Sequence, residues 1–249
     1  MSNFNLYSKY YDLLYRDKDY ESESAYVVKT LKTYLPNLSS LLELGCGSGS
    51  HAKYFADQGL MVTGIERSEE MVEQAIAKEI KNFEIVTADI SAFSLNKKFD
   101  AIISLFHVIS YLTSNDQLIA TFKNAYDHLE ENGLFLFDIW YSPAVYTQKA
   151  LPRIKKIRNN EFEVTRFANS LSEANTNTVI VNFDIFIRNL QDSTINELTE
   201  AHPMRHFSFP EIELLAAHTG FKVIKSEEFL TGSAASENTW GVCFVLQKI

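Results

Sequence analysis

A chain of 249 residues with 46% hydrophobic and 22% charged residues is long enough for a well-buried core and has the composition of a globular protein. Its net charge of −9 argues against a broad nucleic-acid-binding surface, because phosphate binding requires a face dense in Lys and Arg. No apolar run has the length of a signal sequence or a membrane span, and Cys46 and Cys243 lie far apart without nearby His ligands. We therefore expect a cytoplasmic protein with reduced thiols, no bound metal, and no nucleic-acid or membrane partner.

Apolar segments alternate with helical stretches in the first half of the chain, the order expected of βαβ units and a mostly parallel sheet. The predicted strands are Ser40–Leu44, Met61–Glu66, Phe83–Ala88, Phe99–Leu105 and Gly133–Ile139. The predicted helices are Ser50–Gln58, Glu69–Ile80 and Ser114–Glu130, with Gly59 and Gly133 as helix stops.

The pattern changes after Tyr141. Alternating segments such as "TVIVNFDIFIRNL", from about Pro152 to Arg205, predict antiparallel strands laid over the open sheet. The remaining predicted elements are a helix at Phe209–His218 and two strands that pair with each other, Lys222–Leu230 and Trp240–Lys248. The chain is thus expected to form one α/β domain with a core sheet of about seven strands.

The stretch "LLELGCGSGSH" holds three of the nine glycines. Between a strand and a helix, Gly45, Gly47 and Gly49 allow a sharp turn and leave no Cβ between the backbone and a ligand at the carboxyl ends of the strands. Glu66 ends the second strand, where an acidic side chain can accept both hydroxyls of a ribose. A dinucleotide fingerprint would have a third glycine at the position of Ser50, and no P-loop lysine follows the turn.

At these residues the sequence resembles the class I S-adenosylmethionine (SAM)-dependent methyltransferases, whose first motif is an acidic residue followed by G-x-G-x-G. Glu43 precedes the glycines here, Glu66 stands in the ribose position, and "TADI" follows in register for the adenine edge. The resemblance spans most of Leu41–Ile139. It implies a Rossmann-like seven-stranded fold with an antiparallel β insert over the active site, and S-adenosyl-L-methionine as the cofactor. The cofactor-binding residues that it implies are Glu43, Gly45, Cys46, Gly47, Gly49, Glu66, Arg67, Asp89, Ile90 and Leu105.

The flanking segments resemble the bacterial nucleotide-linked amino-sugar N-methyltransferases, which make dimethylamino sugars such as desosamine and mycaminose. The matching positions are Tyr11-Asp12, Tyr15, Thr199-Glu200, His202, Met204-Arg205 and Phe207. Phe106-His107-Val108 stands where that family often has small residues, so the floor of the pocket is expected to differ. The resemblance implies a helical cap over residues 1–39, a SAM-binding core over 40–140 and 207–249, and a substrate lid over 141–206.

Three residues are candidates for accepting a proton from a sugar amine. His107 follows the fourth strand and is expected to face the methyl group of the cofactor, and the resemblance favours Tyr11 and Tyr15. Tyr7, Tyr10, Tyr11 and Tyr15 also fall at helical spacing, which is equally typical of a packing stripe.

The predicted substrate-binding residues are Trp140, Tyr141, Arg153, Arg158, His202 and Arg205. The basic run "KALPRIKKIRNN" is unusual in an acidic chain and favours a diphosphate-binding segment, with a solvated charged face as the alternative. His202 and His206 are also compatible with hydrogen-bonded interior imidazoles.

The most specific interpretation is N-methylation of a nucleotide-linked amino sugar, which would be a small-molecule partner. A homodimer is also compatible with the sequence. Three alternatives stay open. The first is a SAM-dependent methyltransferase of another small molecule, with a free amine, a carboxylate or a hydroxyl as the acceptor. The second is a nicotinamide-dependent oxidoreductase, which the position of the third glycine disfavours. The third is a non-enzymatic SAM-binding module.

Overall fold

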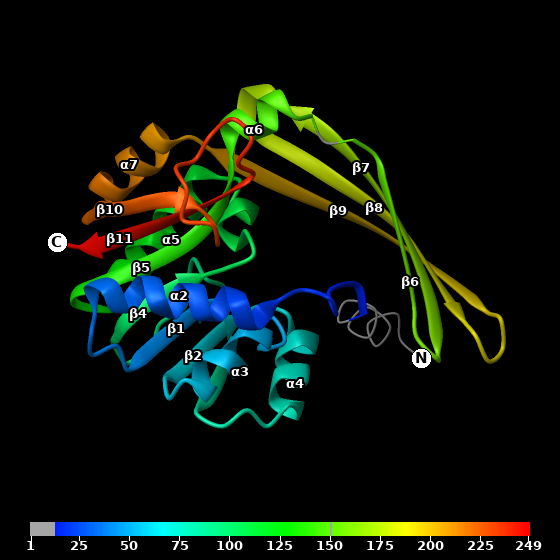
Figure 1. Ribbon diagram of the computed structural model, residues 1–249, viewed down its shortest axis with the longest axis horizontal. Helices are drawn as coiled ribbons and strands as arrows, with labels where there is room; N and C mark the ends of the chain where they lie inside the picture. The colour runs from blue at the N-terminus through cyan, green and yellow to red at the C-terminus, as the bar shows by residue number, and fades with distance from the viewer. Residues whose placement is uncertain (1–12, 150) are drawn as a thin grey trace.

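A seven-stranded core sheet organises the residues described by the computed structural model, 13–149 and 151–249 (Figure 1). In spatial order its strands are β3 (Phe83–Thr87), β2 (Met61–Glu66), β1 (Ser40–Leu44), β4 (Phe99–Ser104), β5 (Leu129–Tyr141), β11 (Gly241–Lys248) and β10 (Phe221–Glu228). The first five run parallel, whereas β11 is antiparallel to both β5 and β10. The predicted Rossmann-like α/β sheet is confirmed.

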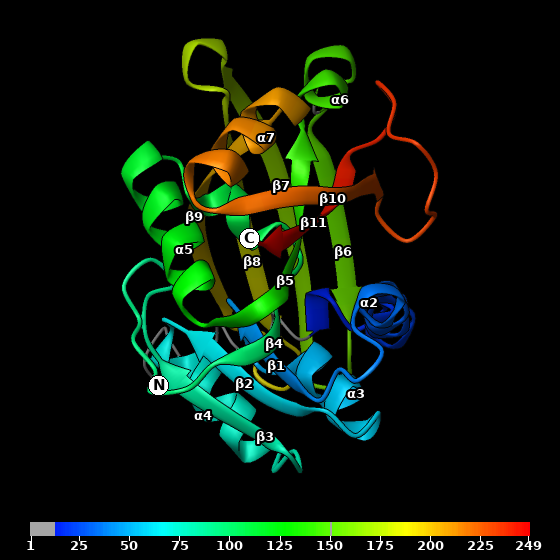
Figure 2. The ribbon, with the colours of Figure 1, turned by 90° about the vertical axis from the view of Figure 1, so that its left-hand side faces the viewer.

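Helices cover both faces of this sheet (Figure 2). They are α2 (Tyr20–Tyr34), α3 (Ser50–Asp57), α4 (Glu69–Ala77), α5 (Asn115–Asp127) and α7 (Phe209–His218). A sixth helix, α6 (Ser142–Thr147), follows the end of β5, and the short 3-10 turns are η1 (Val108–Tyr111) and η2 (Ala174–Thr176). Alternate strand residues face opposite sides, so Leu41 packs with α2 and α3 while Leu42 packs with α5 and α7. In the described part of the chain, no helix has the length and apolar content of a membrane span.

The boundary between the third predicted helix and the fifth predicted strand lies earlier than expected. α5 ends at Asp127, and β5 already begins at Leu129. The pairing of β5 with β4 then skips residues 130–133, which bulge out of the ladder. A Cβ on Gly133 would lie 2.8 Å from the carbonyl oxygen of Glu130. Gly133 thus permits a close backbone approach inside a strand, and its predicted role as a helix stop is wrong.

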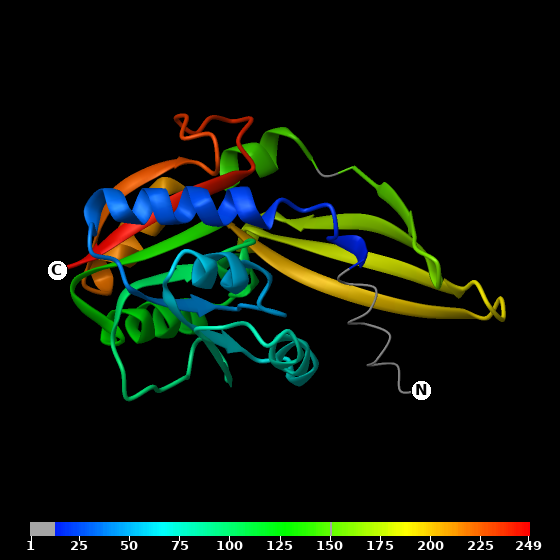
Figure 3. The ribbon, with the colours of Figure 1, turned by 60° about the horizontal axis from the view of Figure 1, so that its bottom comes forward.

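Four long antiparallel strands form an arm, defined here as β6 (Arg153–Arg158), β7 (Phe162–Glu173), β8 (Thr178–Asn189) and β9 (Ile195–Phe207). The arm joins the core because β9 pairs in parallel with the end of β5, at Trp140↔His206 and Tyr141↔Phe207. Figures 1 and 3 show the arm projecting from the core as an arch. The predicted antiparallel β insert is confirmed: its strands extend the sheet through the pairing of β9 with β5, and they face the carboxyl ends of the core strands across a cavity.

The segment before α2 connects the arm to the core. Leu13 and Leu14 are buried against arm residues that include Val164 and Ile185. The ring of Tyr15 then meets the core residue Phe106 edge-on, with ring centroids 5.2 Å apart. This segment therefore contributes to both sides of the space between arm and core.

Candidate active site

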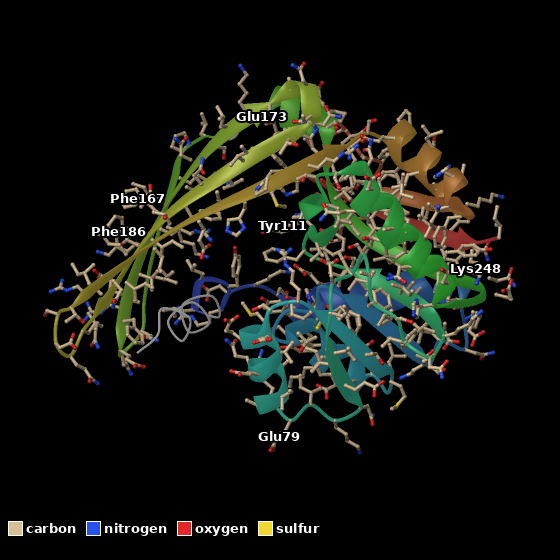
Figure 4. The ribbon with its side chains drawn as sticks, turned by 180° about the vertical axis from the view of Figure 1, so that it is seen from behind. Glu79, Tyr111, Phe167, Glu173, Phe186 and Lys248 are labelled. Carbon is tan, nitrogen blue, oxygen red and sulfur yellow. The ribbon has the colours of Figure 1, made fainter. Side chains whose placement is uncertain are left out.

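A cavity of about 830 Å³ lies between the carboxyl ends of the core strands and the concave face of the arm. Its walls include the glycine turn, the ends of β2 and β4, and side chains from all four arm strands. In Figure 4, the labelled Tyr111 lies in the region where arm and core face each other. This volume lies in the upper part of the roughly 300–1,000 Å³ that small-molecule sites enclose.

The glycine turn after β1 forms one end of the cavity. Gly45 has φ +72°, and a Cβ there would lie 2.6 Å from Val108. Gly47 has φ +55°, lines the cavity, and has no atom within 4 Å of the place where a Cβ would stand. A side chain at Gly47 would thus fill ligand space, which leaves bare backbone as a cradle.

Glu66 at the end of β2 is fixed by three backbone amides. Its Oε2 accepts a hydrogen bond from Gly47 N at 3.0 Å, and its Oε1 accepts from Arg67 N and Ser68 N, both at 2.9 Å. Because a carboxylate oxygen has more than one acceptor site, Oε2 can still accept from ligand hydroxyls. The carboxylate lines the cavity directly beside the cradle at Gly47.

The structure brings most of the predicted cofactor residues to this end of the cavity. Those that line it are Gly45, Cys46, Gly47, Glu66, Arg67, Asp89, Ile90 and Leu105. Glu43 is buried behind the turn, with its Oε1 3.5 Å from His51 Nδ1 and its Oε2 without a hydrogen-bond partner. Gly49 does not line the cavity and instead caps α3 at φ +73°.

An ionic cluster that the sequence analysis missed supports the same wall. His51 lines the cavity and places Nε2 2.8 Å from Glu23 Oε2, and Glu23 also pairs with Lys18. Burial alone would lower the pKa of His51, but hydrogen bonds to Glu23 and Glu43 outweigh it and raise that pKa. Glu23 and Lys18 come from α2 and the segment before it, and no local pattern in the sequence links them to His51.

His107 and Asp138 form a second unit at the carboxyl ends of β4 and β5. His107 Nδ1 lies 2.7 Å from Asp138 Oδ2, and the backbone amide of His107 donates to Asp138 Oδ1 at 3.1 Å. The Nδ1 contact is short but does not meet the geometry of a full hydrogen bond. Burial would raise the pKa of the Asp138 carboxyl, but the nearby imidazole and amide of His107 lower it below its usual range. Asp138 therefore stays ionised and holds Nδ1, leaving Nε2 as the ring nitrogen available for other contacts.

The backbone at this point is strained. Phe106 and His107 have φ of +63° and +61°, a left-handed conformation that is costly for residues with side chains. His107 lines the cavity beside Trp140, with ring centroids 6.3 Å apart. The strain and the pairing with Asp138 together fix the imidazole at the cavity wall.

The two tyrosine candidates have different outcomes. Tyr15 lines the cavity, and its hydroxyl accepts a hydrogen bond from Arg166 Nη1 at 3.3 Å. Tyr11 lies outside the described residues, as do Tyr7 and Tyr10, so the role of Tyr11 stays a prediction.

Strand alternation divides the basic run into two faces. Arg153 and Lys155 of β6 line the cavity, and Arg166 of β7, directly opposite Lys155 in the ladder, lines it too. Lys156 pairs with Glu163 on the outer face of the arm, and Arg158 is exposed and does not line the cavity. The predicted pair of Arg153 and Arg158 is thus separated, and Arg166 joins Arg153 in its place.

The remaining predicted substrate residues are also divided. Trp140 and His202 line the cavity. Tyr141 instead packs on Phe209 with ring centroids 5.0 Å apart. Outside the cavity, the Arg205 guanidinium bonds to Glu211 at 2.6 Å.

Comparisons with known proteins agree with this arrangement. Residues 41–133 match the family model for a methyltransferase domain. The chain is 27% identical over 224 residues to the dTDP-3-amino-3,4,6-trideoxy-alpha-D-glucopyranose N,N-dimethyltransferase of Streptomyces venezuelae, covering 89% of this chain and 91% of the relative.

Two solved structures share the fold over nearly the full length of both chains. Streptomyces venezuelae DesVI superposes with a TM-score of 0.82 at 25% identity, covering 100% of this chain and 99% of that one. An S-adenosylmethionine-dependent methyltransferase from Clostridium acetobutylicum superposes with a TM-score of 0.83 at 21% identity, covering 99% of each chain.

The class I methyltransferase fold, the matching methyltransferase domain and the methyltransferase relatives together show a SAM-dependent methyltransferase, with S-adenosyl-L-methionine as its cofactor. Among such enzymes, the chain is similar along most of its length to an amino-sugar N,N-dimethyltransferase.

Proposed function

We propose that this enzyme N-methylates the amino group of a nucleotide-linked amino sugar. The observation that carries the proposal is one continuous cavity, lined by the glycine cradle and His107 on the core side and by three cations on the arm. The relative from Streptomyces venezuelae is named for a dTDP-linked amino sugar, and it matches across the arm as well as the core. A molecule with an amine at one end and a diphosphate at the other suits this order of groups.

The cofactor end would use the residues that line the cradle. Glu66 is suited to accept the ribose hydroxyls, and Asp89 and Ile90 lie where the adenine edge would be recognised. Glu43 would act through the shape and charge of the wall, because it lies behind the turn. When bound, SAM supplies an electrophilic methyl group.

The chain's own task is to present a neutral, aligned amine. An ammonium group has no free lone pair, so a nearby group must take its proton, and an imidazole can do so near neutral pH. His107 Nε2 is the nitrogen left available by the pairing of Nδ1 with Asp138. Tyr15, which lines the cavity, would serve as a further proton acceptor, and Tyr11 keeps the same proposed role. Correct alignment alone can contribute about 7–11 kcal/mol to such a reaction.

The arm would bind the nucleotide portion. Two phosphates favour clustered cations, and Arg153, Lys155 and Arg166 share one face of the arm. Residues 141–206 would then act as a substrate lid over the core at 40–140 and 207–249. The two described cysteines are free and buried, which suits a reducing, cytoplasmic location.

The test is a direct assay with SAM and a dTDP-linked amino sugar, read by mass spectrometry of the product. We expect one or two added methyl groups, and competition by thymidine diphosphate, which keeps the remote half of the substrate and lacks the amine. Turnover of a free amine, a carboxylate or a phenol with no turnover of any nucleotide sugar would instead favour the small-acceptor alternative.

A further inference from the structure

A chain of three polar side chains crosses the cavity between core and arm. The hydroxyl of Tyr111 lies 3.0 Å from His202 Nδ1, and His202 Nε2 lies 3.0 Å from Glu200 Oε2. Tyr111 belongs to η1 of the core, four residues after His107, whereas Glu200 and His202 belong to β9 of the arm. All three line the cavity.

The geometry of β9 holds this chain in place. Residues two apart on a strand point to the same side, so Glu200 and His202 both face the cavity. The His202 ring is packed edge-on against Tyr111 and Phe183, with centroids 5.8 Å and 5.2 Å away. The imidazole therefore has a fixed orientation, with one nitrogen toward each of its polar neighbours.

The proton positions follow from the hydrogen-bonding capacity of the three groups. An ionised carboxylate only accepts, so the nitrogen facing Glu200 must carry the proton. In neutral imidazole the other nitrogen is then an acceptor, and Nδ1 receives the hydroxyl proton of Tyr111. Partial burial, followed by the charges of Tyr15 and Glu200, raises the pKa of Tyr111 to about 12, so its hydroxyl keeps this proton at neutral pH.

We propose that Glu200 and His202 are positioning residues that keep the Tyr111 hydroxyl donating its hydrogen bond to His202 Nδ1. The Tyr111 oxygen then accepts a hydrogen bond, in a fixed direction, from the substrate that is to be methylated. The ligand group is an N–H or O–H donor: the reacting amine itself or a neighbouring hydroxyl. A bond to the amine would turn its lone pair toward the methyl group, and a bond to a hydroxyl would orient the ring that carries the amine. The substrate class rests on the proposed function, whereas the proton arrangement does not.

The sharpest variant is Glu200→Gln. Glutamine keeps the size of glutamate, but its NH₂ group can donate to Nε2, which would move the imidazole proton to Nδ1. Nδ1 would then donate to the Tyr111 oxygen, and the Tyr111 proton would turn toward the substrate. An isosteric change therefore converts the acceptor into a donor. Glu197→Gln is the matched control, because Glu197 is an exposed residue of the same strand and does not line the cavity.

The first measurement is independent of any substrate. Nitrogen-15 NMR of labelled histidine, in the full-length enzyme at pH 8, should show His202 protonated on Nε2 in the wild type and Glu197→Gln, and on Nδ1 in Glu200→Gln. A wild-type His202 protonated on Nδ1, or on both nitrogens, would overturn the proposal whatever the enzyme methylates.

The second measurement is steady-state kinetics with a dTDP-linked amino sugar. If the wild type does not methylate it, the proposed function fails, and the same kinetics are run on the small amine that the enzyme does methylate. Tyr111→Phe should lower kcat/KM about tenfold through loss of one hydrogen bond, and Glu200→Gln should lower it at least as much. SAM affinity should not change. Unaltered kcat/KM in both variants would overturn the proposal.

A substrate analogue separates the two donors. If Tyr111 binds a hydroxyl, Tyr111→Phe should have no effect on an analogue that lacks the neighbouring hydroxyl. If Tyr111 binds the amine, the variant should impair the analogue and the full substrate equally. Either result supports the proposal and assigns the donor.

Discussion

The two ends of the cavity differ in whether backbone groups or side chains line them. The cofactor end uses backbone: a glycine turn without side chains, and a Glu66 carboxylate held by three amides from two adjacent turns. The acceptor end uses long side chains from separate strands, such as Arg153, Arg166 and His202, which reach inward from the arm. A backbone site is set by the fold itself, whereas a side-chain site can change with each substitution. This difference explains how one core can serve many acceptors.

The largest expected effect is on kcat/KM, and it comes from changing His107 or Asp138. His107→Asn and Asp138→Asn should each lower kcat/KM for the acceptor about 10²- to 10⁴-fold, the usual range for a general base. In the wild type, kcat/KM should rise with pH between about 6 and 9, because only the neutral amine attacks. His107→Asn should lower or shift that limb. Stopped assays over this pH range measure both changes.

The control for this prediction is His218→Asn, an exposed histidine at the end of α7. It should match the wild type in rate and pH profile. An unshifted limb and an undiminished rate in His107→Asn would show that His107 only packs against Trp140.

A larger share of the residues predicted for the cofactor than of those predicted for the acceptor lines the cavity, and the reason is chain distance. Gly47 and Glu66 lie on adjacent strand ends, so a local pattern is sufficient to bring them together. Asp138 was missed although "FLFDIW" carries a usable signal, an acidic residue within an apolar strand. Arg166 was missed because the basic run was treated as one cluster. Period-two alternation would have placed Arg153 and Arg158 on opposite faces.

Two other features of the structure could not be predicted from the sequence. The pairing of His51 with Glu23 depends on how α2 packs beside α3, which no spacing reveals. The direction of the arm depends on the two-residue pairing of β9 with β5. Both are tertiary contacts between segments far apart in the chain.

The second prediction probes the backbone-built end. Glu66→Ala should weaken SAM binding by about 1–3 kcal/mol, the scale of a lost hydrogen bond to a charged group. Since the carboxylate also binds three amides, this variant should melt at a lower temperature, whereas Glu66→Gln should retain more stability. Calorimetry and thermal melts measure the two effects, with Glu69→Ala, an exposed residue in the first turn of α4, as control. An unchanged affinity in a folded Glu66→Ala enzyme would remove Glu66 from the cofactor site.

The third prediction separates ligand space from backbone strain. Gly47 and Gly59 both have positive φ and open space at the Cβ position, but only Gly47 lines the cavity. Alanine at either position should cost about 1–2 kcal/mol of stability. Only Gly47→Ala should also weaken SAM binding, by about tenfold or 1.4 kcal/mol. Equal SAM affinities in the two variants would show that the cofactor does not occupy this cradle.

The fourth prediction probes the side-chain end. Arg153→Gln with Arg166→Gln should raise KM for a nucleotide sugar about tenfold, the scale of one lost charged contact, with SAM affinity unchanged. KM should rise with salt in the wild type and much less in the variant. The control replaces Lys156 and Arg158 with Gln on the outer face of the same strand. If the control raises KM as much as the test variant, the general charge of the arm matters and the cavity face does not.

The last prediction concerns stability rather than ligand binding, at the ionic cluster of His51, Glu23 and Lys18. The pKa of His51 is raised in the folded protein, so its charged form contributes stability that is fully present below the unfolded value of about 6.5 and is lost as pH rises through the folded value. His51→Gln should therefore cost about 2 kcal/mol at pH 6, the scale of a hydrogen bond to a charged group, and less at pH 9.5. Urea unfolding at the two pH values measures the difference, with exposed His218→Gln as the control that should show none. A cost that is equal at both pH values would mean that His51 stabilises this wall as a neutral, packed ring, and that the charges of Glu23 and Lys18 do not hold the cofactor end in place.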